Sequence, residues 1–139
     1  MIHYDGKKFK KFIWNQQIKE KILEASLSIN KYYKNEEIII LCVLEGGIPT
    51  FSDLTKNLKI SYSADYIKVS SYKGATKSSG KIDIDKNIRL NIKDKKILII
   101  EDIVDTGRTL DFLHKRLLDS GAKEVKIFSL LFKRNKYKF

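Results

Sequence analysis

The chain has 139 residues, of which 42% are hydrophobic and 32% charged, and its formal net charge is +11. This length and composition are typical of one soluble globular domain and argue against intrinsic disorder. No apolar stretch approaches the roughly 20 residues that a membrane span requires, and residues 1–11 lack the apolar segment of a secretory signal. We therefore expect a single cytoplasmic domain over residues 1–139, with no membrane partner.

Lysine dominates the positive charge, and residues 133–139 form a basic C-terminal end. Two interpretations stay open: solvated surface lysines, or a positive field that attracts a phosphorylated ligand. The single cysteine, Cys42, lies in an apolar run and excludes a disulfide within the chain. We expect Cys42 in the core, in a reducing compartment.

In chain order, the apolar spacing of residues 14–30 predicts a helix. Residues 38–44 (IIILCVL) form a short apolar run typical of a strand buried on both faces. Pro49 can begin a short helix that extends to residue 58, and residues 66–72 indicate a second strand. Residues 73–86 contain little apolar content and predict a mobile loop or an irregular hairpin. Before the first helix, Trp14 with Phe9 and Phe12 is expected to serve in packing rather than as a base-stacking platform.

Residues 97–100 (ILII) indicate the clearest strand, which acidic and turn residues from 101 to 107 should interrupt. A helix follows from about Thr109 and ends at Gly121, and residues 125–132 return as a strand. Strand, helix and strand in this order predict an α/β fold with a mainly parallel sheet flanked by helices. The two histidines, His3 and His114, have no partners at metal-ligand spacing, and we assign them no ligand role.

The acidic loop after residue 100 contains most of the candidate ligand-binding residues. Ligands of open α/β sheets bind beyond the carboxyl ends of the strands, where Gly107 permits a sharp turn into the helix. Backbone N–H groups there, with the hydroxyls of Thr106 and Thr109, predict a phosphate cradle. Glu101 and Asp102 can accept hydrogen bonds from ribose hydroxyls or hold Mg²⁺ through water.

The acidic loop can also be interpreted without a ligand. Its acids can simply favour the N-terminus of a helix that follows a core strand. A receiver domain also has paired acids after an apolar strand, but further βα units should then follow, and only one helix and one strand remain after residue 109. The loop lacks the G-x-x-x-x-G-K-[ST] pattern of a P-loop.

Four segments carry a resemblance to a known family. Residues 97–110 (ILIIEDIVDTGRTL) resemble the phosphoribosyl-pyrophosphate (PRPP) motif of the type I phosphoribosyltransferases. Residues 69–82 resemble the flexible catalytic loop of the hypoxanthine-guanine branch, and residues 43–54 are similar to its pyrophosphate-contacting loop. Residues 125–134 resemble the strand that carries a purine-reading lysine. The resemblance implies a type I phosphoribosyltransferase-like fold.

The resemblance also implies an activity. Such enzymes transfer the 5-phosphoribosyl group of PRPP to hypoxanthine or guanine, giving IMP or GMP and pyrophosphate, with Mg²⁺ as cofactor. Glu101 and Asp102 would hold the ribose hydroxyls and, indirectly, magnesium, and Asp105 would face purine N7 as a general base. Ser71 and Tyr72 would close over the transition state. The 5′-phosphate would lie against Asp105, Thr106, Gly107, Arg108 and Thr109.

Further roles follow from the same resemblance. Lys133 would donate to the 6-oxo group of the purine, and the alternative is a solvated lysine in the basic end. The backbone amides of Glu45 and Gly46 would meet the pyrophosphate, with an unusual peptide geometry. Many relatives have Lys in place of Glu45, so only the backbone role carries over. The family chain normally continues past the lysine strand, and we expect a shortened purine pocket, with PRPP bound better than purine.

Two other functions stay open: a PRPP-binding regulator, as in relatives that attenuate pyrimidine operons, and a weakly active remnant of the fold. The predicted loop with Ser71 and Tyr72 favours the enzyme. Family members are usually homodimers or homotetramers, which we also expect here. A nucleic-acid partner is not expected.

Overall fold

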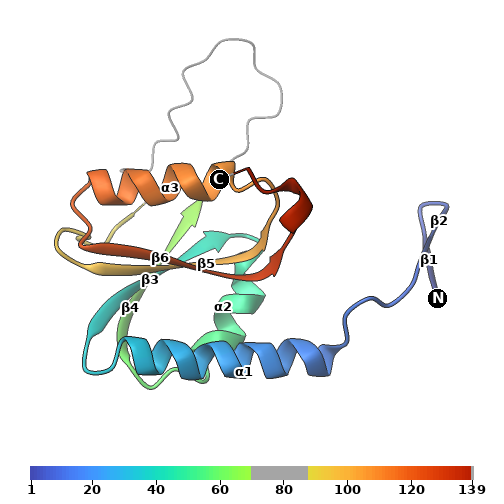
Figure 1. Cartoon of the computed structure of the whole chain (residues 1–139), viewed down its shortest axis with the longest axis horizontal. Coiled ribbons are helices and arrows are strands. Elements are labelled where there is room, and N and C mark those ends of the chain that lie inside the picture. The colour runs from blue at the N-terminus through green and yellow to red at the C-terminus, as the bar shows by residue number, and fades with distance from the viewer. Residues whose placement is uncertain (70–87, 139) are drawn as a thin grey trace, which may run out of the picture.

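Within residues 1–69 and 88–138, which the computed structural model describes, four parallel strands form a sheet with helices on both faces (Figure 1). The strand order is β4-β3-β5-β6, and every neighbouring pair is parallel. Helix α3 covers one face, and α1 and α2 cover the other. The predicted α/β fold is confirmed. The elements are β1 (Ile2–Tyr4), β2 (Lys7–Phe9), α1 (Asn15–Tyr32), β3 (Glu37–Leu44), α2 (Gly47–Thr55), β4 (Ser61–Lys68), β5 (Lys96–Val104), α3 (Arg108–Asp119), β6 (Glu124–Phe132) and the 3₁₀ turn η1 (Arg134–Lys136).

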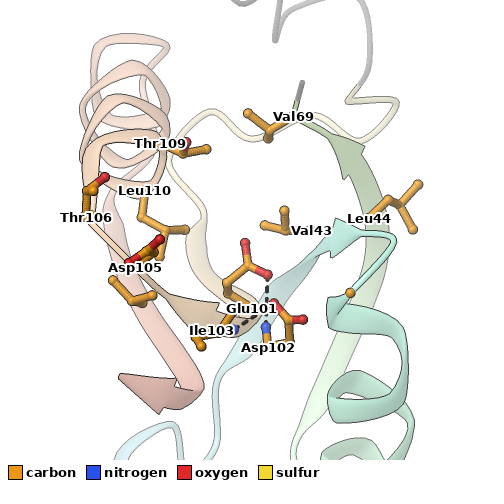
Figure 2. A pocket seen from close by; sticks show the side chains of 13 residues that line it. Val43, Leu44, Val69, Glu101, Asp102, Ile103, Asp105, Thr106, Thr109 and Leu110 are labelled. Carbon is orange, nitrogen blue, oxygen red and sulfur yellow. Dashed lines mark hydrogen bonds between the residues drawn. The ribbon is translucent and has the colours of Figure 1, made fainter. Parts of the chain in front are cut away.

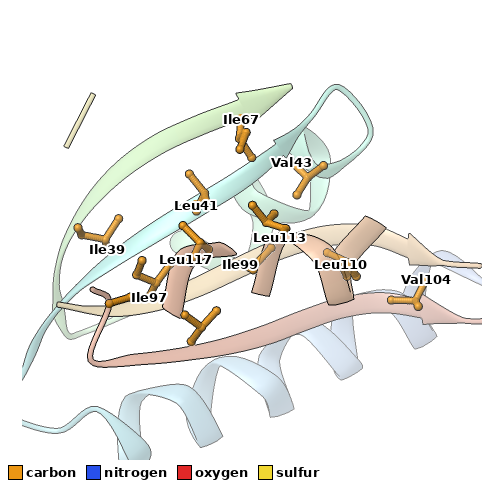
Figure 3. Packing of buried hydrophobic residues seen from close by; sticks show 12 residues of the cluster. Ile39, Leu41, Val43, Ile67, Ile97, Ile99, Val104, Leu110, Leu113 and Leu117 are labelled. Atoms are coloured by element: carbon orange, nitrogen blue, oxygen red, sulfur yellow. The ribbon is translucent and has the colours of Figure 1, made fainter. Parts of the chain in front are cut away.

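The central strands β3 and β5 are apolar on both faces, because each face is covered by helices. Successive side chains of a strand point to opposite faces, so one run of branched residues fills two core layers. The layer under α3 is shown in Figure 3 and contains Ile39, Leu41, Val43, Ile67, Ile97, Ile99, Leu110, Leu113 and Leu117. The layer under α1 and α2 contains Ile22, Tyr33, Ile38, Ile40, Leu54, Leu98 and Ile100. Cys42 is fully buried, as expected, and burial raises the pKa of its thiol to about 11.

Strand β5 corrects one prediction. The acidic residues do not interrupt it: the strand continues through Glu101 and Asp102 to Val104. Pairing with β6 explains the continuation, since Glu101 lies opposite Ser129 and Val104 lies opposite Phe132. The backbone hydrogen bonds of the ladder outweigh the low strand propensity of the acids. The chain therefore turns only after Val104.

Strand β4 also differs from its prediction. It covers Ser61–Lys68 rather than residues 66–72, and pairs along its whole length with β3. Its polar residues make β4 difficult to recognise as a strand from the sequence alone. Asp65, only 1% exposed, accepts hydrogen bonds from the backbone N–H groups of Tyr66, Arg89 and Leu90 at 2.8, 2.6 and 3.2 Å. The predicted loop of residues 73–86 lies outside the described residues.

The N-terminal segment corrects a third prediction. The β1–β2 hairpin stands away from the sheet (Figure 1), and Phe9, Phe12 and Trp14 are 48%, 87% and 59% exposed, so they do not pack against the body. Trp14 instead precedes α1, where its backbone N–H donates to Gln17 Oε1 at 2.8 Å. Among the described residues, no helix is long and apolar enough to cross a membrane.

Candidate active site

A cleft of about 310 Å³ lies at the carboxyl ends of the central strands. The turn from β3 into α2 forms one side, and the turn from β5 into α3 forms the other. Figure 2 shows Glu101 pointing into the space between these turns. Because β4, β3, β5 and β6 are parallel, their carboxyl ends meet at this one edge of the sheet. The lining residues are Val43, Leu44, Gly46, Val69, Glu101, Asp102, Ile103, Val104, Asp105, Thr106, Gly107, Thr109 and Leu110.

The two carboxylates at the base of the cleft are tied to the backbone of β5. Asp102 N–H donates to Glu101 Oε1 at 2.9 Å, and Ile103 N–H donates to Asp102 Oδ1 at 2.6 Å. Burial, together with the hydrogen bond to the Asp102 side chain, raises the pKa of Glu101 to about 7. A carboxyl group with this pKa can exchange a proton near neutral pH, and hydroxyl donors would favour its charged form.

The turn after β5 has the features of an anion-binding site. Gly107 has a φ of 84°, a left-handed conformation that glycine adopts without a Cβ clash, and α3 begins at the next residue. The first backbone N–H groups of a helix have no acceptor within it. In Figure 2, Thr106 and Thr109 lie on this same wall of the cleft. Amides, hydroxyls and the positive end of the helix dipole therefore converge where a phosphate could bind.

The opposite turn, from β3 into α2, has the unusual geometry expected there. The peptide bond between Leu44 and Glu45 is cis. At Gly46 an added Cβ would collide with the Asp102 carboxylate, 2.7 Å from its Cγ. Glycine thus lets the turn lie directly against the Asp102 carboxylate, and a larger residue at this position would require that side chain to move. This close approach joins the two sides of the cleft.

Asp105 lies next to the basic C-terminal segment. Its Oδ1 is 3.6 Å from Lys133 Nζ and 3.9 Å from Lys136 Nζ. The contact arises because β6 pairs with β5 to its end and Lys133 N–H then donates to the Val104 carbonyl at 3.0 Å. Lys133 is therefore tied to the site loop by its backbone. The sequence alone did not indicate that Lys136 lies near the site. The only feature that pointed to it was its position in the basic C-terminal end.

The structure brings most of the predicted residues together. Glu101, Asp102, Asp105, Thr106, Gly107, Thr109 and Gly46 line the cleft, and Lys133 contacts Asp105. Arg108 and Glu45 do not line it; the Glu45 side chain turns to Lys68. Ser71 and Tyr72 lie outside the described residues. In the described part of the chain, no three His, Cys, Asp or Glu side chains cluster to hold a metal ion.

The family model described as phosphoribosyl transferase domain matches residues 13–139. The chain belongs to the phosphoribosyltransferase family. The resemblance to this family is confirmed, which excludes the receiver-domain interpretation.

Individual members of the family agree with this assignment. The hypoxanthine-guanine phosphoribosyltransferase of Lactococcus lactis is 38% identical over 122 residues, which cover 88% of this chain and 66% of that protein. The hypoxanthine-guanine-xanthine phosphoribosyltransferase of Tritrichomonas foetus is 34% identical over 85% of this chain and 64% of that protein. The chain thus spans about two thirds of the length of these relatives.

Solved structures give the same fold. A hypoxanthine-guanine phosphoribosyltransferase of Bacillus anthracis, crystallised with a HEPES molecule in the active site, matches with a TM-score of 0.84 and 34% identity. The match covers 94% of this chain and 78% of that one. For a hypoxanthine phosphoribosyltransferase of Staphylococcus aureus the TM-score is 0.80 at 33% identity, over 89% of this chain and 67% of that one.

Proposed function

We propose that this phosphoribosyltransferase acts in purine salvage, transferring the 5-phosphoribosyl group of PRPP to hypoxanthine or guanine. The products are IMP or GMP and pyrophosphate. The observation that carries the proposal is the cleft itself: the turn of Thr106, Gly107 and Thr109 and the residues Glu101 and Asp102 line one space of about 310 Å³. The names of its relatives support the choice of purine.

Different residues of the cleft bind different parts of the substrate. The turn of Thr106, Gly107 and Thr109 takes the 5′-phosphate through amides and hydroxyls. Glu101 and Asp102 accept hydrogen bonds from the 2′- and 3′-hydroxyls of the ribose. These contacts fix the anomeric carbon relative to the purine and to the leaving group.

The reaction separates charge, because the ribosyl centre becomes oxocarbenium-like as pyrophosphate leaves. Asp105 accepts the proton from purine N7, and its ion pairs with Lys133 and Lys136 hold its carboxylate in place. Lys133 also donates to the 6-oxo group, which favours 6-oxopurines over adenine. Ser71 and Tyr72 are proposed to exclude water during transfer.

Mg²⁺ is the proposed cofactor, and when bound it neutralises the pyrophosphate and makes it a better leaving group. The donor set fits this ion, because magnesium is commonly held by one or two carboxylates together with water and substrate phosphates. Glu101 and Asp102 would hold it indirectly, through water or the ribose hydroxyls.

The enzyme is proposed to act in the cytoplasm as a homodimer or homotetramer. Exposed apolar side chains at the start of α1 and along it support a subunit interface: Phe12, Trp14, Leu23 and Leu27. A regulatory role and a remnant role are not favoured by the comparisons, since the relatives are named as transferases.

The test is a transfer assay with labelled purines. The chain is incubated with PRPP and Mg²⁺ and with hypoxanthine, guanine or adenine in turn, and the nucleotides are separated by chromatography. We expect IMP and GMP in the first two reactions and no AMP in the third. AMP alone, or no nucleotide from any base, would contradict the proposal.

A further inference from the structure

The turn between β3 and α2 presents an electrostatic problem. Glu45 stands between Leu44 and Gly46, which both line the cleft, and its side chain is 78% exposed. A carboxylate at this place repels a pyrophosphate bound at the same turn. The cleft therefore needs a cation next to Glu45 if it is to hold the leaving group of PRPP.

Lys68 occupies that position. It is the last residue of β4, and the parallel pairing of β3 with β4 places it opposite Leu44. Its Nζ is 3.4 Å from Glu45 Oε1. The next residue, Val69, lines the cleft. Lys68, at the end of β4, and Glu45, just after β3, therefore lie side by side next to residues that line the cleft.

The pair has little value for stability. Both side chains are largely exposed, Lys68 by 70% and Glu45 by 78%, and exposed ion pairs of this kind contribute little to stability. Its position is more informative. An ammonium group has three donors, so Lys68 can donate to Glu45 and still offer two N–H groups to phosphate oxygens.

We propose that Lys68 binds the pyrophosphate of PRPP and that Glu45 is a positioning residue, which holds the ammonium group over the β3–α2 turn. The pair then leaves the rim neutral before binding, and the four-carbon stem of Lys68 lets its charge reach the leaving group. This inference rests on the proposed function, because it assigns the leaving-group half of the same cleft.

The first experiment separates the pyrophosphate half of the site from the nucleotide half. The parent and Lys68→Met are titrated calorimetrically with Mg²⁺-pyrophosphate and, separately, with IMP. We expect Lys68→Met to bind pyrophosphate at least about tenfold more weakly, the usual cost of losing a charged hydrogen bond, and to bind IMP within twofold of the parent. Retained IMP binding shows that the variant is folded.

Lys56→Met is the matched control. Lys56 also forms an exposed ion pair, with Asp53 at 2.9 Å, but at the far end of α2 from the cleft. The Lys56→Met variant removes the same charge from the molecule as Lys68→Met does. We expect it to bind both ligands as the parent does, so that a general effect of net charge is separated from a local one.

A charge exchange tests the role of Glu45. Lys68→Glu alone places two carboxylates at the rim and should bind pyrophosphate most weakly of all the variants. Adding Glu45→Lys returns one ammonium and one carboxylate to the same rim, and we expect affinity to recover to within about fivefold of the parent, less than the loss expected for a missing charged bond. A double variant no better than Lys68→Glu would overturn the positioning role.

The outcomes distinguish this inference from the proposed function. If the parent binds pyrophosphate and IMP and Lys68→Met binds both equally well, the assignment of Lys68 is wrong and the proposed function stands. If the parent binds neither ligand, the proposed function fails, and the assignment of Lys68 fails with it.

Discussion

Glu101 is the titratable residue whose environment in the cleft is most unusual. Burial and the Asp102 side chain raise the pKa of its carboxyl group from 4.5 to about 7. The folded state therefore binds a proton more tightly than the unfolded state. Between these two values the free energy of unfolding falls as pH rises, and above pH 7 the full cost of the buried charge is present.

We predict that Glu101→Gln removes this cost. The variant should gain stability relative to the parent from pH 5 to pH 8, reaching about 1–2 kcal/mol once solvent screening is allowed for. Urea unfolding at the two pH values measures the difference. A stability difference that does not change with pH would mean that Glu101 does not titrate in this range. The variant should also lose affinity for PRPP, since an amide accepts more weakly from ribose hydroxyls than a carboxylate does.

Asp105 is the second residue with a specific expectation. As a proton acceptor at purine N7 it should affect turnover more than PRPP affinity, so Asp105→Asn should lower kcat by about 10²-fold. Steady-state rates across pH, with PRPP varied at each pH, measure both effects.

Asp111→Asn is the control, because Asp111 lies on α3, pairs with Lys115 at 2.8 Å and does not line the cleft. We expect its rates to match those of the parent. An unchanged rate and pH profile in Asp105→Asn would show that Asp105 serves only to shape the turn.

At the scale of the elements, Asp65 connects β4 to Arg89 and Leu90. Burial pushes the pKa of its carboxyl group up, but the hydrogen bonds from the N–H groups of Tyr66, Arg89 and Leu90 and from the Arg89 side chain outweigh it and hold the pKa below its usual value. Its charged form therefore stabilises the fold above the unfolded pKa, and this contribution is lost as pH falls through the folded value.

Asp65→Asn should destabilise the protein by about 2–4 kcal/mol at pH 7, because an amide nitrogen then faces backbone donors in a buried position. The difference from the parent should shrink between pH 7 and pH 3, because the parent loses the contribution of the charged form as pH falls below the unfolded pKa of Asp65. Chemical unfolding at both pH values measures this. Equal differences at pH 7 and pH 3 would contradict an electrostatic role for Asp65.

The turn from β5 into α3 offers a matched pair of glycines. Gly107 begins α3 with a φ of 84°, and Gly121 follows α3 with a φ of 94°, away from the cleft. Alanine at either position meets the same left-handed backbone, so each substitution should cost about 1–2 kcal/mol of stability. We predict that Gly107→Ala alone weakens Mg²⁺-PRPP binding, as measured by calorimetry. Equal affinities for the two variants would mean that the turn does not hold the phosphate.

At the scale of the whole molecule, the sequence predicted the α/β class, the buried strands of the central sheet and the glycine turn that leads into α3. These predictions succeeded because uniform apolar runs and glycine turns can be recognised from the local sequence. The end of β5 and the span of β4 were mispredicted because the partner strand, not the local sequence, decides where a ladder stops. The contacts of Asp105 with Lys133 and of Glu45 with Lys68 could not be predicted either, because they depend on strand pairing between segments that are distant in the sequence.

The central claim is that one cleft, at the carboxyl ends of β3 and β5, holds the phosphoribosyl group. A calorimetric titration with Mg²⁺-PRPP tests it most directly, on the parent and on a variant that combines Thr106→Val with Thr109→Val. Both changes keep side-chain shape and remove the hydroxyl donors. Thr55→Val, in α2, is the control, since Thr55 Oγ1 donates to the Phe51 carbonyl at 2.8 Å outside the cleft. We predict one PRPP bound per parent chain, an affinity at least about tenfold lower in the double variant and no change in the control. Undiminished PRPP binding by the double variant would contradict the claim.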